Sequence, residues 1–125
     1  MSTIALTEDN FVSTIEDNSI VLIDFWAEWC APCRMFGPVF EQSSEQHDDI
    51  VFAKVDTEAQ QNLAGAMGIT SIPTLMAFRE GIGVFAQPGA MQSASLEKLI
   101  EAIRDLDMDE VRAQIEQQQK DAATN

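Results

Sequence analysis

Two apolar runs constrain the fold of this chain more than any other feature of its sequence. The segments IVLIDFW, at 20–26, and IVFAKVD, at 50–56, are rich in β-branched and aromatic residues. Near-continuous apolar runs of this length are typical of strands that are buried on both faces of a sheet. Both runs therefore predict central strands of a sheet that other elements cover.

The segments beside these strands carry helical patterns. A first helix is predicted after Thr7, which is a candidate N-cap residue followed by acidic side chains. A second helix is predicted over 33–46, with Pro38 as a kink inside it. A third is predicted over 58–67, ending before Gly68, since glycine commonly follows the last turn of a helix. Helices thus alternate with the two apolar runs.

The second half of the chain predicts a hairpin and a further helix. PTLMAF, at 73–78, is a third strand, REGIG is a turn, and VFA, at 84–86, is a short fourth strand. Residues 3–6 are a candidate for one more strand. The later helix has an apolar face made of Leu96, Leu99, Ile100 and Ile103. The element order predicts an α/β fold with a mixed sheet of four or five strands and helices on both faces.

The last residues form a separate tail in this interpretation. Asp107 with Glu110 three residues later resembles a capping box that starts a polar helix with a thin apolar stripe. The end of the chain, QQQKDAATN, is expected to be frayed. We therefore predict one domain over 1–106 and a C-terminal helical extension over 107–125. Most of the extension is expected to be solvated.

Charge and hydropathy exclude some functions. The formal net charge is −14, from 21 acidic and 7 basic residues, and such a surface repels the phosphates of nucleic acid. No stretch approaches 18 consecutive apolar residues, so no membrane-spanning segment is predicted. The N-terminal sequence MSTIALTEDNFVSTI has neither a basic region nor an apolar core of a secretory signal. We therefore expect a cytoplasmic location, where most thiols stay reduced.

The cysteine pair is the strongest candidate for chemistry. Cys30 follows a predicted strand, and Cys33 lies three positions later in the first turn of a predicted helix. This spacing brings both thiols to one helical face, close enough for a disulfide. At the helix N-terminus, free N–H groups and the helix dipole stabilise a thiolate. One exposed thiolate beside a protected thiol is the arrangement that dithiol exchange requires.

Three other interpretations of the pair stay open. A zinc site needs four ligands, and His47, otherwise expected to be a surface residue near a helix end, is the only further nitrogen candidate. The cysteines are alternatively inert core residues, or they form a static structural disulfide. The redox interpretation explains the spacing, the strand–helix context and the compartment together.

With these residues in view, the chain resembles the thioredoxin family over roughly residues 3–106. The matching motifs occur in the family's order and spacing: DFWAEWCAPCR at 24–34, KVD at 54–56, SIPT at 71–74 and GA at 89–90. A CxxC motif alone is a moderate signal. Its combination with a preceding strand aspartate and a following Ile-Pro-Thr makes the resemblance specific.

The resemblance implies a role for each matching residue. Cys30 corresponds to the attacking nucleophile and Cys33 to the resolving thiol. Asp24 lies within an apolar strand, so burial should raise its pKa, and in the family this aspartate transfers protons to and from the resolving cysteine. Lys54 corresponds to a lysine near that aspartate, and Pro73 to a cis-proline. The alternatives are a structural charge at Asp24, a solvated Lys54 and a trans-proline.

The resemblance also implies a surface that docks protein substrates. The Ile72 backbone would pair with an extended substrate segment in a short form of strand addition. Trp26 is more simply explained as core packing beside the site. The expected substrate-binding rim is apolar and consists of Trp29, Ala31, Pro32, Ile72, Gly89 and Ala90.

Four residues depart from the family's usual pattern. Ala31 replaces a glycine and Arg34 a lysine, while Thr57 and Pro88 stand where aliphatic residues are common. Residues between the cysteines tune the reduction potential, and the other changes are expected to affect substrate preference.

The function implied by the resemblance is that of a general protein-disulfide reductase. The expected partners are the flavoprotein thioredoxin reductase, which draws on NADPH, and clients such as ribonucleotide reductase, peroxiredoxins and methionine sulfoxide reductase. The protein itself is expected to be a monomer without a cofactor or metal, because the cysteine pair carries the electrons. A disulfide oxidant or isomerase is one alternative, and a redox-gated binding module or processivity-type subunit that uses the apolar rim is another.

Overall fold

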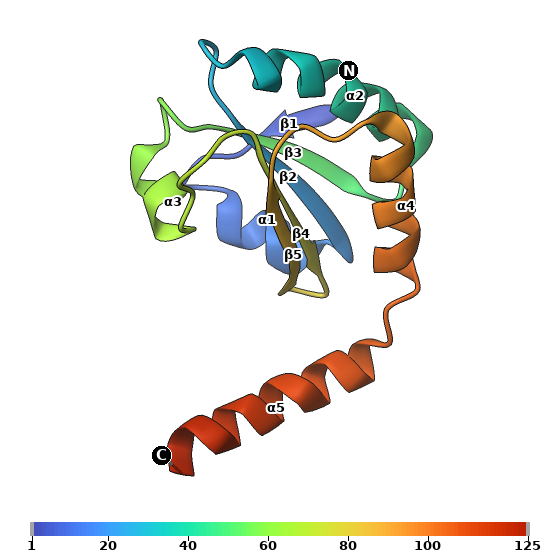
Figure 1. The fold of residues 1–125 in the computed structure, drawn as a ribbon. Helices are drawn as coiled ribbons and strands as arrows, with labels where there is room; N and C mark the ends of the chain where they lie inside the picture. The colour runs from blue at the N-terminus through green and yellow to red at the C-terminus, as the bar shows by residue number, and fades with distance from the viewer. Residues whose placement is uncertain (1, 125) are drawn as a thin grey trace.

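The computed structural model describes residues 2–124 and contains a five-stranded mixed sheet with helices on both faces (Figure 1). The strand order is β1-β3-β2-β4-β5, with β2 parallel to β3 and antiparallel to β4. The predicted α/β fold is thus confirmed, with five strands. The elements are β1 (Thr3–Ala5), α1 (Phe11–Asp17), β2 (Ile20–Trp26), α2 (Ala31–Gln46), β3 (Val51–Asp56), α3 (Gln61–Ala66), β4 (Thr74–Arg79), β5 (Ile82–Pro88), α4 (Ser93–Arg104) and α5 (Met108–Thr124).

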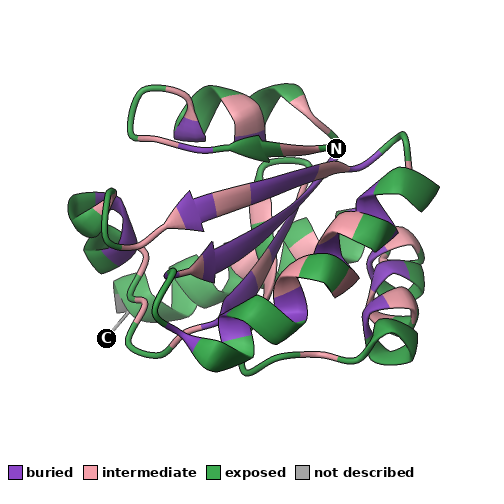
Figure 2. Ribbon diagram, turned by 90° about the horizontal axis from the view of Figure 1, so that it is seen from above, coloured by how far each residue is buried: buried purple, intermediate pink, exposed green. Residues whose placement is uncertain are grey.

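The central strand β2 is buried on both faces, as its composition predicts. Successive side chains point to opposite sides of a strand. Val21 and Ile23 therefore belong to one apolar cluster, which includes residues of α1 and α3, whereas Leu22 belongs to the cluster on the side of α2 and α4. Figure 2 shows buried residues along the central strands and on the helix surfaces that face them. Asp24 has the same parity as Leu22, so it lies on the side that α2 covers.

The contact between α2 and the sheet is largely aromatic. The ring of Phe40, which has no exposed surface, lies 5.7 Å from that of Phe36 and 5.2 Å from that of Phe52, measured between centroids. Edge-to-face and offset arrangements at these distances favour aromatic packing. Because Phe40 follows Pro38 within α2, this packing anchors the middle of the helix that begins at the cysteine pair.

A polar network joins the end of α2 to α4. His47 Nε2 lies 2.8 Å from Glu97 Oε2, and His47 Nδ1 lies 3.1 Å from Arg104 Nη2. The expectation that His47 is a surface residue near a helix end is only partly correct: it follows α2 but is half-buried. The cause is tertiary, since both of its partners come from a helix some fifty residues later in the chain.

The predicted boundaries of the first and third helices differ from the structure. The first helix begins at Phe11, because Thr7 and Asn10 form a turn in which Thr7 N donates to Asn10 Oδ1. Thr7 is therefore not the N-cap. The third helix, α3, is shorter than the predicted 58–67, because Asp56 Oδ1 accepts N–H groups in a turn that precedes it. Gly68 follows it with φ of 72°, as a residue after a helix C-terminus does.

The hairpin and α5 complete the fold. The β4–β5 turn has positive φ at Glu80 and Gly81. β5 is longer than the predicted 84–86 because its pairing with β4 extends from Ile82 to Pro88, with one register shift opposite Ala77 and Phe78. Asp107 Oδ1 accepts from Glu110 N at the start of α5, as predicted. Arg112 on α5 forms an ion pair with Glu80 of the turn. The division at residue 107 into domain and extension, and fraying at the end, stay predictions.

Candidate active site

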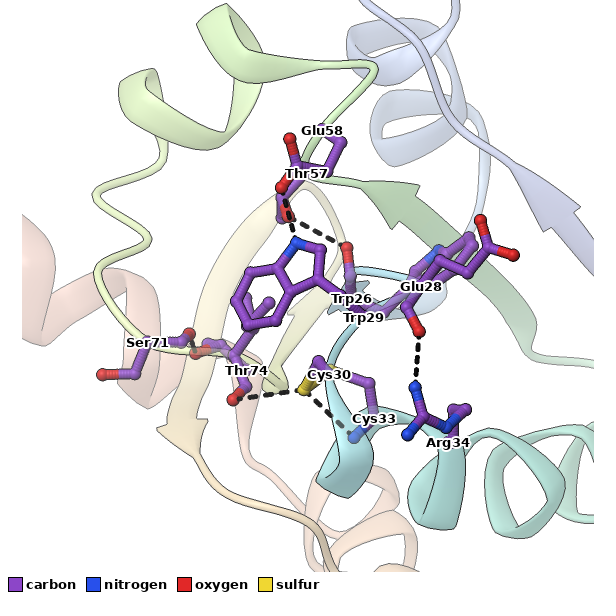
Figure 3. Close-up of a disulfide and its surroundings, with 11 residues drawn as sticks. Trp26, Glu28, Trp29, Cys30, Cys33, Arg34, Thr57, Glu58, Ser71 and Thr74 are labelled. Carbon is purple, nitrogen blue, oxygen red and sulfur yellow. Dashed lines mark hydrogen bonds between the residues drawn. A yellow bond between two sulfur atoms is a disulfide. The ribbon is translucent and has the colours of Figure 1, made fainter.

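The two cysteines form a disulfide at the N-terminus of α2 (Figure 3). Cys30 is the N-cap residue of this helix, and its Sγ accepts a hydrogen bond of 3.2 Å from the N–H of Cys33. Pro32 occupies the first turn, where a missing N–H costs nothing. Both cysteines are buried in the disulfide form, with 4% of Cys30 and 3% of Cys33 exposed, so the expected contrast between an exposed and a protected sulfur is absent here. The same N–H that approaches Cys30 Sγ in the disulfide is in place to stabilise a Cys30 thiolate after reduction.

A loop before β4 lies against the sulfur of Cys30. The carbonyl oxygen of Ile72 is 3.8 Å from Cys30 Sγ. The loop is held at both ends, since Thr74 Oγ1 donates to the carbonyl oxygen of Ser71 at 2.6 Å and Gly89 N donates to that of Pro73 at 2.8 Å. The Ile72–Pro73 peptide bond is cis, in agreement with the conformation that the resemblance implies. The backbone of Ile72 is therefore fixed beside the reactive sulfur.

Asp24 is an unpaired carboxyl group in the protein interior. Its side chain has no exposed surface, and neither carboxylate oxygen has a hydrogen-bond partner. Burial raises the pKa of Asp24 from 3.8 to about 7, and the charge of Lys54 acts in the opposite direction. Asp24 and Lys54 are partners in the β2–β3 register. A carboxyl group with a pKa near neutral pH is suited to accept and return a proton.

Lys54 lies near the aspartate but is directed to an aromatic ring. Its Nζ stands 5.0 Å from the centroid of the Trp26 ring, a cation–π distance. Among the described residues, Lys54 and Asp24 do not form an ion pair. Trp26 is half-buried and packs against the apolar cluster around the cysteines, as the core-packing interpretation predicts.

Trp29 is the largest exposed side chain at the site, with 67% of its surface accessible. Its indole Nε1 donates to Glu58 Oε1 at 2.6 Å, so a carboxylate holds the ring in place (Figure 3). On the other side of Cys30, Arg34 Nη1 donates to the carbonyl oxygen of Glu28 at 2.7 Å. These bonds order the short segment between β2 and α2.

The structure brings the predicted rim residues to the surroundings of Cys30. Trp29, Ala31 and Pro32 are exposed around the start of α2, and Ile72 is half-buried in the facing loop. Gly89 and Ala90 are exposed and join this group through the bond from Gly89 N to Pro73. The roles of these residues in docking stay predictions.

Sequence reasoning missed three residues that organise the site, namely Glu28, Glu58 and Thr74. Glu58 is one of 21 acidic residues, and no local pattern marks it as the partner of a tryptophan 29 positions earlier. Thr74 lies within the SIPT motif, but its bond to Ser71 depends on the conformation of the loop.

The described residues, 2–124, contain neither a candidate metal site nor a candidate membrane span. Within residues 2–124 no group of three or more histidine, cysteine, aspartate and glutamate side chains is placed to hold a metal ion. In the same part of the chain, no helix combines the length and the apolar character needed to cross a bilayer. The arrangement is suited instead to a reversible two-electron step, in which a dithiol and a disulfide interconvert.

Comparisons with known proteins agree with this geometry. The family model described as Thioredoxin matches residues 2–102. A curated protein of Streptomyces coelicolor, "Putative thioredoxin 2", is 59% identical over 121 residues, which cover 97% of this chain and 90% of the relative. "Thioredoxin C-3" of Corynebacterium nephridii is 41% identical over 99 residues, covering 78% of this chain and 68% of the relative. The Streptomyces match thus includes most of α5, whereas the family model ends before it.

Solved structures show the same fold. A mutant thioredoxin of Halobacterium salinarum superposes with a TM-score of 0.76 at 36% identity, covering 83% of this chain and 91% of that one. A thioredoxin of Plasmodium falciparum gives a TM-score of 0.74 at 35% identity, covering 80% of this chain and 97% of that one.

Proposed function

Because this chain belongs to the thioredoxin family and is a thiol–disulfide oxidoreductase, we propose that it works as a reductant of disulfides in other proteins. The observation that carries the proposal is the placement of Cys30 at the N-terminus of α2. There its Sγ receives an N–H group and lies beside the Ile72 carbonyl. A thiolate stabilised in this way is a good nucleophile at neutral pH.

The proposed reaction starts from the reduced pair. The Cys30 thiolate attacks one sulfur of a substrate disulfide, and the other substrate sulfur leaves as a thiolate that takes up a proton. Cys33 then loses its proton and attacks Cys30 Sγ, which releases the second substrate thiol. Substrate gains two electrons and two protons, and the protein ends with the Cys30–Cys33 disulfide that the structure contains.

Asp24 is the proposed proton acceptor for Cys33. It lies on the side of β2 that α2 covers, and its pKa of about 7 leaves a large fraction ionised at neutral pH. The ionised carboxylate takes the thiol proton as Cys33 attacks, and the protonated form returns it during re-reduction. Lys54 favours the ionised form, since its positive charge lowers the Asp24 pKa against the effect of burial.

The proposed partners follow from the direction of the reaction. Thioredoxin reductase, a flavoprotein that uses NADPH, would return two electrons to the Cys30–Cys33 disulfide. The proposed clients are disulfide-containing enzymes such as ribonucleotide reductase, peroxiredoxins and methionine sulfoxide reductases. The proposed location is the cytoplasm, where a reducing environment keeps substrates of this kind in turnover. We propose that the protein works without a cofactor of its own.

The reduction potential is the decisive test of direction. We would equilibrate the protein in dithiothreitol or glutathione buffers and follow tryptophan fluorescence, since Trp26 packs beside the disulfide. The potential is about −270 mV for thioredoxin, about −180 mV for protein disulfide isomerase and about −120 mV for DsbA. A value close to the first supports the proposal. A value near the other two contradicts it and favours the isomerase or oxidant alternative.

Cysteine variants test the roles of the two sulfurs. Cys33→Ser should accumulate a mixed disulfide with a substrate, because Cys30 attacks and nothing resolves the intermediate. Cys30→Ser should accumulate little mixed disulfide, since Cys33 lies inside the first turn of α2 and lacks the N-cap position at which an N–H group stabilises a Cys30 thiolate. Equal trapping by both variants would contradict the assignment. If the double variant Cys30→Ser, Cys33→Ser retained full cellular function, the binding-module alternative would be favoured instead.

A further inference from the structure

A shallow groove leads from the reactive sulfur toward α3. It has a volume of about 350 Å³ and lies between Trp29, the start of the loop that ends at Ile72, and the outer surface of α3. No charged side chain lines it, and its exposed lining is mainly apolar. We call it the Trp29 groove. Its residues include Trp29, Thr57, Ala64, Ile69 and Ile72.

The Trp29 groove continues into an acidic hollow. The hollow has a volume of about 280 Å³, shares Gln61 with the groove, and carries the carboxylates of Glu8 and Glu58. No lysine or arginine lines either one. Glu58 marks the junction, because its carboxylate accepts the hydrogen bond from the Trp29 indole. Negative charge is therefore fixed at the far end of an uncharged groove.

The charge around Cys30 is uneven. On the α2 side, the exposed guanidinium of Arg34 places a positive charge against the backbone of Glu28 (Figure 3). On the α3 side, no described lysine or arginine lines the groove or the hollow beside Glu8 and Glu58. A charged substrate residue would therefore meet a different field on each side of the reactive cysteine.

We propose that Glu58 makes the reaction selective for charge, so that among protein substrates lying in the Trp29 groove those with a lysine or arginine directed toward Glu58 react faster. This inference rests on the proposed function. The groove begins at the Ile72 carbonyl, next to the sulfur that attacks, so a segment that reaches Cys30 is already at its entrance.

The long side chains of lysine and arginine suit this path. Their methylene stems can lie along apolar surface such as the Trp29 ring while the charged head stays in water. The head would then reach the Glu58 carboxylate at the end of the groove. A glutamate in the same place would meet two like charges. The substrate class is therefore disulfide proteins whose reactive cysteine has a basic neighbour on one side.

Peptides with a single variable residue test the proposal. Each peptide would be a homodimer joined by the disulfide of its cysteine and would otherwise be uncharged. Its one variable residue, Lys, Gln or Glu, would stand at one of the three positions on either side of the cysteine. The rate at which each oxidises the reduced protein would be followed by stopped-flow tryptophan fluorescence at low ionic strength. On one side of the cysteine, we expect Lys to react about two- to fivefold faster than Gln, as for one exposed ion pair. Glu should be slower than Gln.

Charge-removing variants separate the groove from the general field. Glu58→Gln retains an acceptor for the Trp29 indole but removes the charge, so the Lys/Gln rate ratio should fall toward about one. In the double variant Glu8→Gln, Glu58→Gln, the ratio should be closer to one than in the single variant. Comparing ratios between variants cancels the intrinsic reactivity of each peptide. Glu116→Gln is the matched control, because it removes one charge from α5, which contacts the β4–β5 turn instead of α3. It should leave the ratio unchanged.

The outcomes are distinct. Loss of the Lys preference in Glu58→Gln but not in Glu116→Gln supports the proposal, as does its loss in about 0.5 M salt. An equal ratio in the parent protein and Glu58→Gln overturns it. The proposal is also overturned if the Lys preference is equal at all peptide positions and Glu116→Gln reduces it as much as Glu58→Gln does. Only the net charge of −14 would then act. If the uncharged peptide is not reduced at all, the proposed function itself fails.

Discussion

Replacement of Asp24 by asparagine tests how strongly burial controls the ionisation of this carboxyl group. The side chain is fully buried, its oxygens have no hydrogen-bond partner, and burial raises its pKa from 3.8 to about 7. The folded state therefore binds a proton more tightly than the unfolded state. Under this linkage, stability is greatest below the unfolded pKa and falls as the pH rises toward the folded pKa.

The size of the effect follows from the shift. One pKa unit corresponds to about 1.36 kcal/mol, so the shift from 3.8 to about 7 lowers the stability of the folded protein by roughly 4 kcal/mol above neutral pH. Between about pH 5 and about pH 8.5, roughly 3 kcal/mol of this loss occurs. Asp24→Asn cannot ionise. Its free energy of unfolding, relative to that of the parent protein, should therefore improve by about 3 kcal/mol over that interval.

Urea unfolding of the oxidised protein at the two pH values measures this change. Any fixed cost of burying an amide cancels, because only the change between the two pH values is compared. Asp17→Asn, at the exposed C-terminal end of α1, is the matched control and should show no such change. If the difference between Asp24→Asn and the parent protein were the same at both pH values, the reasoning would be refuted. The carboxyl group would then ionise in the folded protein as it does in the unfolded chain.

Three further substitutions test the fold by urea unfolding. Arg79→Met should cost about 1–3 kcal/mol, because Arg79 Nη1 donates to three carbonyl oxygens at the end of α4 and just after it; a loss below about 0.5 kcal/mol would contradict this. Gly68→Ala should cost about 1 kcal/mol because φ is 72° there, whereas Gly65→Ala in α3, where a Cβ atom also meets nothing, should be neutral or stabilising. Equal effects at the two glycines would remove the argument from φ. Phe40→Ala should cost about 3–5 kcal/mol, since the ring is fully buried among other aromatic rings; a much smaller cost would indicate that the neighbouring rings collapse into the space.

Much of the fold was predictable because its signals are local. The apolar run at 20–26 needed no tertiary information to predict a strand buried on both faces, and β2 has those bounds. The second helix was predicted over 33–46; α2 ends at Gln46 as predicted but begins two residues earlier, at Ala31. The boundaries of α1 and α3 were less accurate, because side chains such as Asn10 and Asp56 close turns by hydrogen bonds that compete with the first turn of a helix.

The site divides in the same way. The sequence by itself determined the residues to which we assign the chemistry: a cysteine pair at a strand–helix junction, and a carboxyl group, Asp24, in an apolar strand. Tertiary structure alone decided what surrounds them, including the bond from Trp29 to Glu58 and the approach of Ile72 to Cys30. The physical reason is that spacing and burial depend on neighbouring residues, whereas a contact between residues 29 or 42 positions apart exists only after the sheet has assembled.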